Sequence, residues 1–125
     1  MYSKKGAISM QMLTFVLNNI DLLEDVISEL NNAGIHGATI LDSTGMGRLL
    51  YNSRNENIPI FGSLRMILNN NRPFNKTIFT VLKDSEVQIA INAIKAVVGD
   101  LSQPDAGILF TIPVNFVEGI PMNEN

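Results

Sequence analysis

The chain has 125 residues, a formal net charge of -3 and no cysteine. A domain of this length buries enough surface to fold without a covalent cross-link. The missing cysteines exclude disulfides and thiolate metal sites. The nine basic residues are scattered rather than clustered, so we expect no nucleic-acid-binding surface.

The chain also lacks the apolar segments that direct a protein into a membrane. No run approaches the roughly 18 apolar residues of a spanning helix. Residues 1–6 contain two lysines, but no apolar stretch of signal-peptide length follows them. We therefore expect a cytoplasmic protein without direct membrane insertion.

The first third of the chain predicts a strand, a helix and a second strand. Residues 10–18 are rich in large apolar and β-branched side chains, which is typical of a buried strand. Asp21 then fits an N-cap, with Glu24 as its capping-box partner. The helix is expected to stop at 31–34, and residues 38–42 form the second strand.

The same order of elements recurs about 65 residues later. Residues 76–82 predict a strand, Asp84 or Ser85 is expected to cap a helix that stops at Gly99, and 107–114 form the last strand. Two interleaved β-α-β units give an α+β fold with a four-stranded antiparallel sheet and both helices on one face. This is the ferredoxin-like double β-α-β sandwich.

The other face of this sheet needs a cover. Residues 12–17 and 108–114 are apolar on both faces of their strands, although helices can cover one face alone. A second copy of the same sheet fits this role, so we expect a closed homo-oligomer. The alternative is a monomer covered by its own segment 59–71.

The intervening segment 49–75 is the least regular part of the chain. Residues 51–59 are polar and predict an exposed loop, whereas 60–68 have the spacing of a short amphipathic helix. The apolar residues Phe61, Leu64 and Leu68 fit a plug for the domain's own core better than a docking surface for a partner. Both interpretations predict an insertion that can move.

The segment before this insertion carries the strongest functional pattern. Gly45 and Gly47 straddle one residue and are followed by Arg48, so backbone N–H groups and a guanidinium can meet one anion. A glycine there also suits a positive φ at Gly47. We interpret Ser43 and Thr44 as hydrogen-bonding loop residues rather than nucleophiles. No catalytic signature occurs, so the pattern indicates binding and not catalysis.

These motifs resemble those of the PII family of signal-transduction proteins. The resemblance spans about 10–119 and is most specific at Gly-Ile-x-Gly-x-Thr (34–39) and Gly-Met-Gly-Arg (45–48). It implies a single PII-like domain over 1–125, a trimer with inward-facing sheets, and adenine nucleotide in the clefts between subunits. It also implies a protein that is not an enzyme and that contacts a transporter or metabolic enzyme through the 49–75 loop.

The resemblance further implies a nucleotide site of eight residues: Gly37, Thr39, Gly45, Met46, Gly47, Arg48, Val81 and Gly107. Gly37 and Thr39 would lie beside the adenine, and Val81 would line the base. Gly45 and Gly47 would supply backbone at the foot of the loop, and Arg48 would reach a phosphate. Gly107 would form the tight turn near the phosphates. No metal ligand is implied.

The chain also departs from the family pattern. Asp105-Ala106-Gly107-Ile108 stands where Gly-Asp-Gly-Lys is usual, and residues 115–121 lack two usual arginines. Three lost cations remove charge-assisted contacts of roughly 1.5 to 3 kcal/mol each. Arg54, Arg65 or Arg72 can substitute for them.

The sequence supports three hypotheses about function. The first is a PII-like regulator with ATP, ADP or AMP as regulatory ligand and no obligatory cofactor. The second is a ferredoxin-like trimer that binds a metal ion or another nucleotide, and the third is an enzyme on the same fold. Leu49 replaces the glutamine that holds magnesium and 2-oxoglutarate in the family, so we expect no sensing of 2-oxoglutarate.

Overall fold

The computed structural model describes residues 9–55, 59–70 and 74–120. The elements in chain order are β1 (Met10–Leu17), the 3-10 helix η1 (Ile20–Leu22), α1 (Leu23–Asn32), β2 (Thr39–Ser43), α2 (Met46–Asn55), α3 (Ile60–Asn70), β3 (Asn75–Lys83), α4 (Asp84–Val98) and β4 (Ile108–Val114). Among these described residues, no helix is long and apolar enough to cross a membrane.

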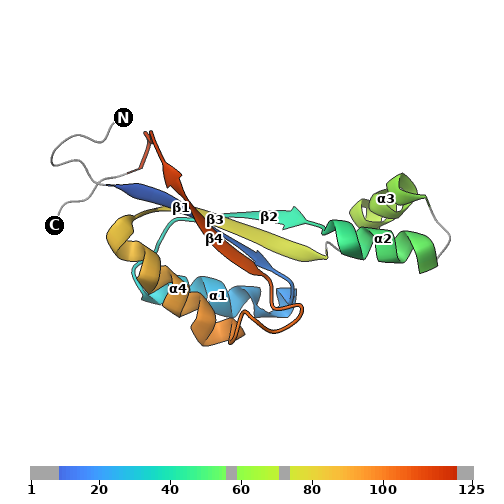
Figure 1. The fold of residues 1–125 in the computed structure, drawn as a ribbon, viewed down its shortest axis with the longest axis horizontal. Helices are drawn as coiled ribbons and strands as arrows, with labels where there is room; N and C mark the ends of the chain where they lie inside the picture. The colour runs from blue at the N-terminus through green and yellow to red at the C-terminus, as the bar shows by residue number, and fades with distance from the viewer. Residues whose placement is uncertain (1–8, 56–58, 71–73, 121–125) are drawn as a thin grey trace.

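The four strands form one antiparallel sheet in the order β2-β3-β1-β4. β1 is central, because its residues pair with β3 on one side and with β4 on the other. Helices α1 and α4 lie side by side on the same face of the sheet (Figure 1). The predicted α+β, ferredoxin-like arrangement is therefore confirmed. The sheet, α1 and α4 together form the body of the molecule.

The core of the body lies between the sheet and these two helices. The inward-facing side chains of β1 are fully buried because they meet both helices and the neighbouring strands. The core side chains alternate along the strands and recur at helical spacing in α1 and α4. They are Leu13, Phe15, Leu17, Val26, Leu30, Ile35, Ile78, Leu82, Ala90, Ala93 and Ile94.

Both helix starts of the body differ from the predicted ones. The side chain of Asn19 accepts a hydrogen bond from the Asp21 N–H, at 3.2 Å, and so caps η1 in place of the expected Asp21 cap. In α4 the N-cap is Lys83, whose N–H donates to Glu86 Oε1 at 2.8 Å. The predicted Asp21–Glu24 capping box is wrong, because a 3-10 turn takes up the chain before α1 begins.

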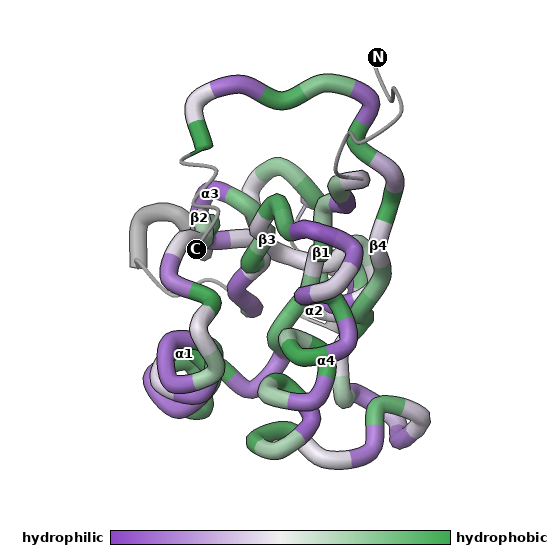
Figure 2. The backbone as a smooth tube through the Cα atoms, turned by 90° about the vertical axis from the view of Figure 1, so that its left-hand side faces the viewer, coloured by the Kyte–Doolittle hydropathy of each residue, from purple (hydrophilic) through white to green (hydrophobic). Residues whose placement is uncertain are grey.

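The second face of the sheet is apolar, and none of the described helices lies over it (Figure 1). Ile108, Phe110 and Ile112 of β4 are exposed there, Ile108 by 62%. Figure 2 shows hydrophobic colour along much of β1 and β4. Segment 59–70 does not cover this face, because α3 packs mainly against α2 (Figure 1). A large exposed apolar face marks an interaction surface.

Helices α2 and α3 form a hairpin that projects from one end of the sheet (Figure 1). The expected short helix at 60–68 is confirmed and runs to Asn70, whereas the loop expected from Tyr51 is helical up to Asn55. Leucine, methionine and arginine favour helix, and this local preference outweighs the asparagines between them. The 49–75 insertion therefore carries two helices.

Candidate functional site

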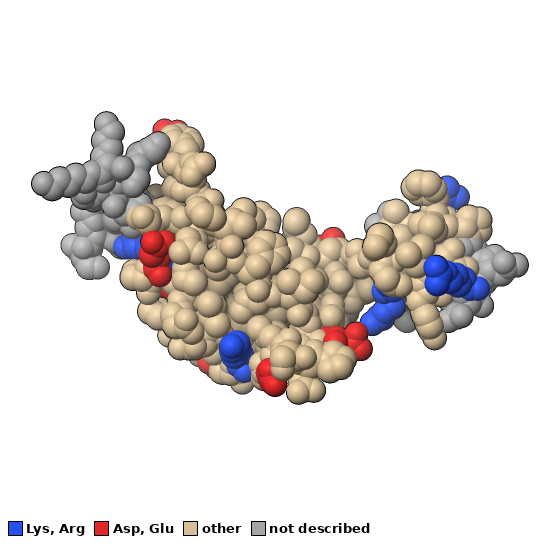
Figure 3. Space-filling view, viewed as in Figure 1, with Lys and Arg blue, Asp and Glu red and all other residues tan. Residues whose placement is uncertain are grey.

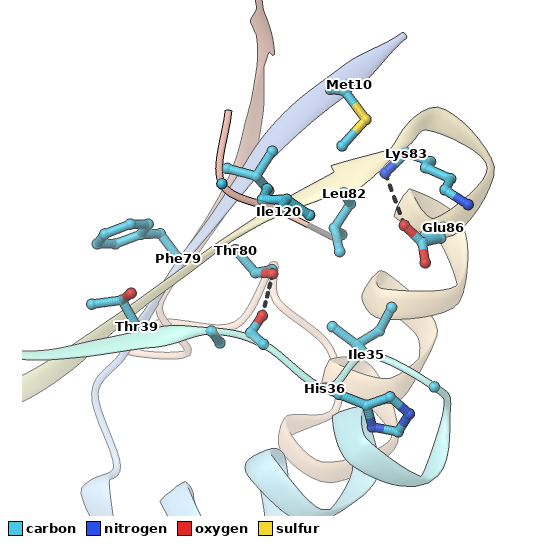
Figure 4. Close-up of a pocket in the computed structure, with 15 residues that line it drawn as sticks. Met10, Ile35, His36, Thr39, Phe79, Thr80, Leu82, Lys83, Glu86 and Ile120 are labelled. Carbon is cyan, nitrogen blue, oxygen red and sulfur yellow. Dashed lines mark hydrogen bonds between the residues drawn. The ribbon is translucent and has the colours of Figure 1, made fainter. Parts of the chain in front are cut away.

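A cavity of about 800 Å³ opens at the end of the sheet where β2 begins and β3 ends. Its wall comes from the segment between α1 and β2, from the last residues of β3, and from the C-terminal segment at Gly119 and Ile120. Met10 of β1 and Glu86 of α4 complete the wall, and Figure 4 shows the side chains from these parts of the chain around one space. Among the described residues the cavity is partly open to solvent, so a ligand can enter it.

The segment between α1 and β2 is held tightly against the body. Gly34 ends α1 with a φ of 94°, which glycine adopts without strain. The N–H of Ile35 then donates to Leu30 O at 2.9 Å, and the Ile35 side chain is buried in the core. These contacts aim the following residues along the floor of the cavity.

Two side-chain contacts fix the rest of this segment. His36 Nδ1 lies 2.7 Å from Asn31 Oδ1, so Nδ1 carries the proton and donates to that amide oxygen. Thr80 Oγ1 donates to Gly37 O at 2.5 Å, which ties the segment to β3 (Figure 4). The backbone at 36–38 is thereby placed beside the strand before any ligand arrives.

The charged groups of the cavity stand where β3 passes into α4. Lys83 and Glu86 both line the wall, and the Glu86 carboxylate is held by the Lys83 N–H (Figure 4). Glu86 therefore occupies the α4 N-terminus, where a helix would otherwise offer N–H groups to an anion. One ammonium and one carboxylate leave this wall close to electrical balance.

Three of the eight predicted residues meet at this cavity. Gly37, Thr39 and Val81 all line it. Thr39 pairs with Phe79, which also lines the wall. Gly37 has no positive φ, and a Cβ added there would meet nothing within 4 Å. The position therefore does not require glycine for backbone conformation or for packing within the described chain.

The Gly-Met-Gly-Arg motif lies at the opposite end of β2, outside the cavity. Gly45 O accepts the N–H of Leu49 at 3.0 Å, so the expected glycine loop is the first turn of α2. Gly47 has no positive φ, and a Cβ there would meet nothing, so that expectation is wrong. Met46 is exposed, and the Arg48 guanidinium lies 5.3 Å from the centre of the Phe74 ring. The ring holds Arg48 by a cation–π contact.

Polar side chains surround the start of α2. Ser43 Oγ lies 2.7 Å from Thr77 Oγ1 and also bonds the Asn75 side chain. The Thr44 Oγ1 atom is buried, and no hydrogen-bond partner for it exists in the described part of the chain. The hydrogen-bonding role predicted for Ser43 is confirmed, although Ser43 ends β2 rather than lying in a loop, whereas the Thr44 hydroxyl makes no such bond among the described residues.

Gly107 marks a third location. Its φ is 112°, and a Cβ at this position would lie 2.2 Å from Val16 O. Only glycine fits this turn, which joins the α4 side of the body to β4. β4 and β2 are the two edges of the sheet, with β1 and β3 between them. By the strand register, Gly107 lies at the end of the sheet where β2 leads into α2, with β1 and β3 between it and β2, and away from the cavity.

Sequence reasoning missed several residues of the cavity, among them Met10, Phe79, Lys83, Glu86 and Ile120. The signal for Lys83 and Glu86 was their position directly after a strand, at the start of a helix. No pattern pointed to Ile120. The described residues contain no group of three or more histidines, aspartates and glutamates arranged to hold a metal ion.

Comparison with known proteins places these features in context. A protein-family model described as nitrogen regulatory protein P-II matches residues 10–124. Among solved structures, the chain is similar to Arabidopsis thaliana PII bound to citrate, with a TM-score of 0.61 and 19% identity, over 97% of this chain and 92% of that one. At this identity the likeness supports the fold alone. No match emerges from the curated proteins.

Proposed function

The chain belongs to the nitrogen regulatory protein P-II family, and we propose that it is a regulator that binds an adenine nucleotide and controls a partner protein. The family membership agrees with the resemblance predicted from the motifs at 34–39 and 45–48. The proposal covers three parts: the ligand, the assembly that completes the ligand site, and the surface that acts on the partner.

The cavity is the observation that carries the ligand proposal, because it unites Gly37, Thr39 and Val81. A purine needs apolar walls and a few fixed polar groups. Met10 and Val81 offer apolar surface, and the tethered backbone at 36–38 offers N–H and C=O groups for the edge of the base. The Thr39 hydroxyl adds a donor and an acceptor beside them.

The phosphate contacts call for a second copy of the chain. By the strand register, Gly107 and the start of α2 with Arg48 lie at the end of the sheet opposite to the cavity, so a single copy does not bring them to a ligand bound in the cavity. The exposed apolar face of the sheet supports association with other copies. In the proposed homotrimer, each nucleotide lies in a cleft between neighbours, and groups from two subunits contact it.

The hairpin of α2 and α3 is the proposed contact for the partner, a transporter or a metabolic enzyme. It projects from the body and begins at Gly45, next to the proposed phosphate contacts. A ligand that binds near its base with different affinity in two hairpin positions shifts the population between them. The protein would thus act by binding in the cytoplasm, and not as an enzyme.

A second candidate ligand follows from the charges of the cavity. Glu86 places a carboxylate on the wall beside Lys83, which disfavours a densely charged triphosphate there. This charge pattern favours a nucleotide with fewer phosphates, or a different small ligand on the same scaffold. Titration with ligands of increasing phosphate number separates the two candidates.

The test is calorimetric titration of the purified protein with ATP, ADP and AMP, with and without magnesium, together with its mass in solution. We expect a trimer that binds one nucleotide per chain, and weaker binding in Arg48→Ala with the trimer intact. If an intact trimer binds none of the three nucleotides, the adenine proposal is contradicted. Turnover of the bound nucleotide contradicts the proposal that the protein is not an enzyme.

A further inference from the structure

The hairpin of α2 and α3 differs in charge from the rest of the molecule. All four arginines of the chain lie within 48–72, whereas all five lysines lie outside that segment. Of the twelve acidic residues, only Glu56 falls between 46 and 74. Helices α2 and α3 contain Arg48, Arg54 and Arg65 and no acidic residue. Figure 3 shows blue without red over this hairpin, while red atoms lie over the body.

The same hairpin exposes large apolar side chains. Phe61 is 78% exposed, Tyr51 is 64% exposed, and Met46, Ile60 and Met66 are also exposed. Side chains of this size are normally buried in a folded domain. Here they stand on a projection whose two helices pack mainly against each other. The hairpin therefore presents arginine and apolar groups together.

We propose that this hairpin docks onto a protein partner that presents carboxylates around an apolar pocket, with Phe61 in the pocket and Arg54 and Arg65 on the carboxylates. This inference rests on the proposed function and names the chemistry of its partner. Arginine, tyrosine, phenylalanine and methionine are enriched at protein interfaces, whereas lysine and the acidic residues are depleted.

The choice of arginine separates this partner from other anionic surfaces. A guanidinium binds a carboxylate through two parallel hydrogen bonds, which lysine cannot make. An anionic lipid surface attracts lysine and arginine alike. Nucleic acid requires several phosphate contacts along a basic surface, and here ten carboxylates of the described body would oppose them. A carboxylate-bearing protein surface therefore fits the hairpin best.

The first experiment replaces Phe61 by the photo-crosslinking residue p-benzoylphenylalanine in cells of the source organism. The matched control places the same residue at Ile89, an exposed apolar position of α4 on the body. We expect light to join the Phe61 position to one protein, at a peptide that contains aspartate or glutamate. Crosslinks to lipid, to nucleic acid or to a second copy of this chain overturn the proposal, as does a yield no higher than at Ile89.

The second experiment titrates the purified partner with two double variants. The double variant Arg54→Lys with Arg65→Lys keeps both positive charges but removes the paired N–H groups of each guanidinium. Its affinity for the partner should therefore fall about tenfold. Arg54→Gln with Arg65→Gln should weaken it further. Equal affinity of the wild-type chain and the lysine variant overturns the proposal. Nucleotide titration of the same variants keeps the two proposals distinct: unchanged nucleotide affinity assigns the loss to partner binding, whereas weakened nucleotide affinity places Arg54 or Arg65 on the phosphates and overturns their role at the partner.

Discussion

The body buries its large side chains, whereas the hairpin of α2 and α3 exposes them. Phe15 of β1 is 0% exposed, whereas Phe61 of α3 is 78% exposed. The body is held together by contacts between elements that are distant in sequence, and the hairpin by contacts between two neighbouring helices. We conclude that the body determines stability and that the hairpin is free to serve recognition.

The largest expected effect contrasts these two phenylalanines. Phe15→Ala removes a ring from the core and should lower the free energy of unfolding by about 3 to 5 kcal/mol. Phe61→Ala should change it by no more than about 0.5 kcal/mol, since the ring is mostly in solvent. Urea unfolding followed by circular dichroism measures both. Similar losses in the two variants would mean that the hairpin is part of the core.

Two glycines sharpen the comparison. Gly107→Ala forces a Cβ against Val16 O at a positive φ, so it should cost about 3 kcal/mol or more. Gly47→Ala places a Cβ in open space within α2 and should stabilise that helix by up to about 1 kcal/mol. Both are measured by thermal unfolding. A harmless Gly107→Ala would contradict the geometry of the turn before β4.

A smaller effect tests how the floor of the cavity is held. Thr80→Val keeps the shape of the side chain and removes the hydrogen bond to Gly37 O, at a cost of about 0.5 to 1.5 kcal/mol. Thr80→Ser is the matched control, because it keeps the hydroxyl. If the backbone at 36–38 contacts the nucleotide, the valine variant should also bind it more weakly in calorimetry. Equal nucleotide affinity of Thr80→Val and Thr80→Ser would show that this hydrogen bond does not contribute to ligand binding.

Only a small change in body stability is expected from removing the hairpin altogether. Ser43 and Asn75 pair directly across β2 and β3, so an Asn-Gly turn can replace residues 44–74 and close a two-residue hairpin. The body should remain folded, with its free energy of unfolding within about 1 kcal/mol of the wild-type value, because a short turn also costs less closure entropy. Loss of cooperative unfolding would show that α2 and α3 support the sheet.

The contrast between body and hairpin also explains what the sequence could predict. The strands and helices of the body carry long apolar patterns that match burial, so their order and the sheet followed from periodicity. In the hairpin, the sequence at the start of α2 predicts a glycine loop. In the structure, the N–H of Leu49 instead donates to Gly45 O in a helical turn. The glycines at 45 and 47 did not predict that a helix begins at this position.

The candidate site was predictable only where the motif is local. Gly37 and Thr39 lie in one short segment, and β3 brings Val81 beside them through the strand order. Glu86 and Ile120 reach the cavity by tertiary packing, which no short pattern encodes. A charge count over the whole chain also hides the separation of arginine in the hairpin from lysine outside it, because the two residue types carry the same charge.

The central claim is that adenine binds in the cavity at the end of the sheet where β2 begins and β3 ends. Photolabelling with 8-azido-AMP and 8-azido-ATP, followed by mass spectrometry of the labelled peptides, tests this location directly. We predict labels within 34–39 or 79–83 that an excess of unmodified nucleotide suppresses. Labels confined to the hairpin or to the outer faces of α1 and α4, or labels that nucleotide does not suppress, would contradict the claim.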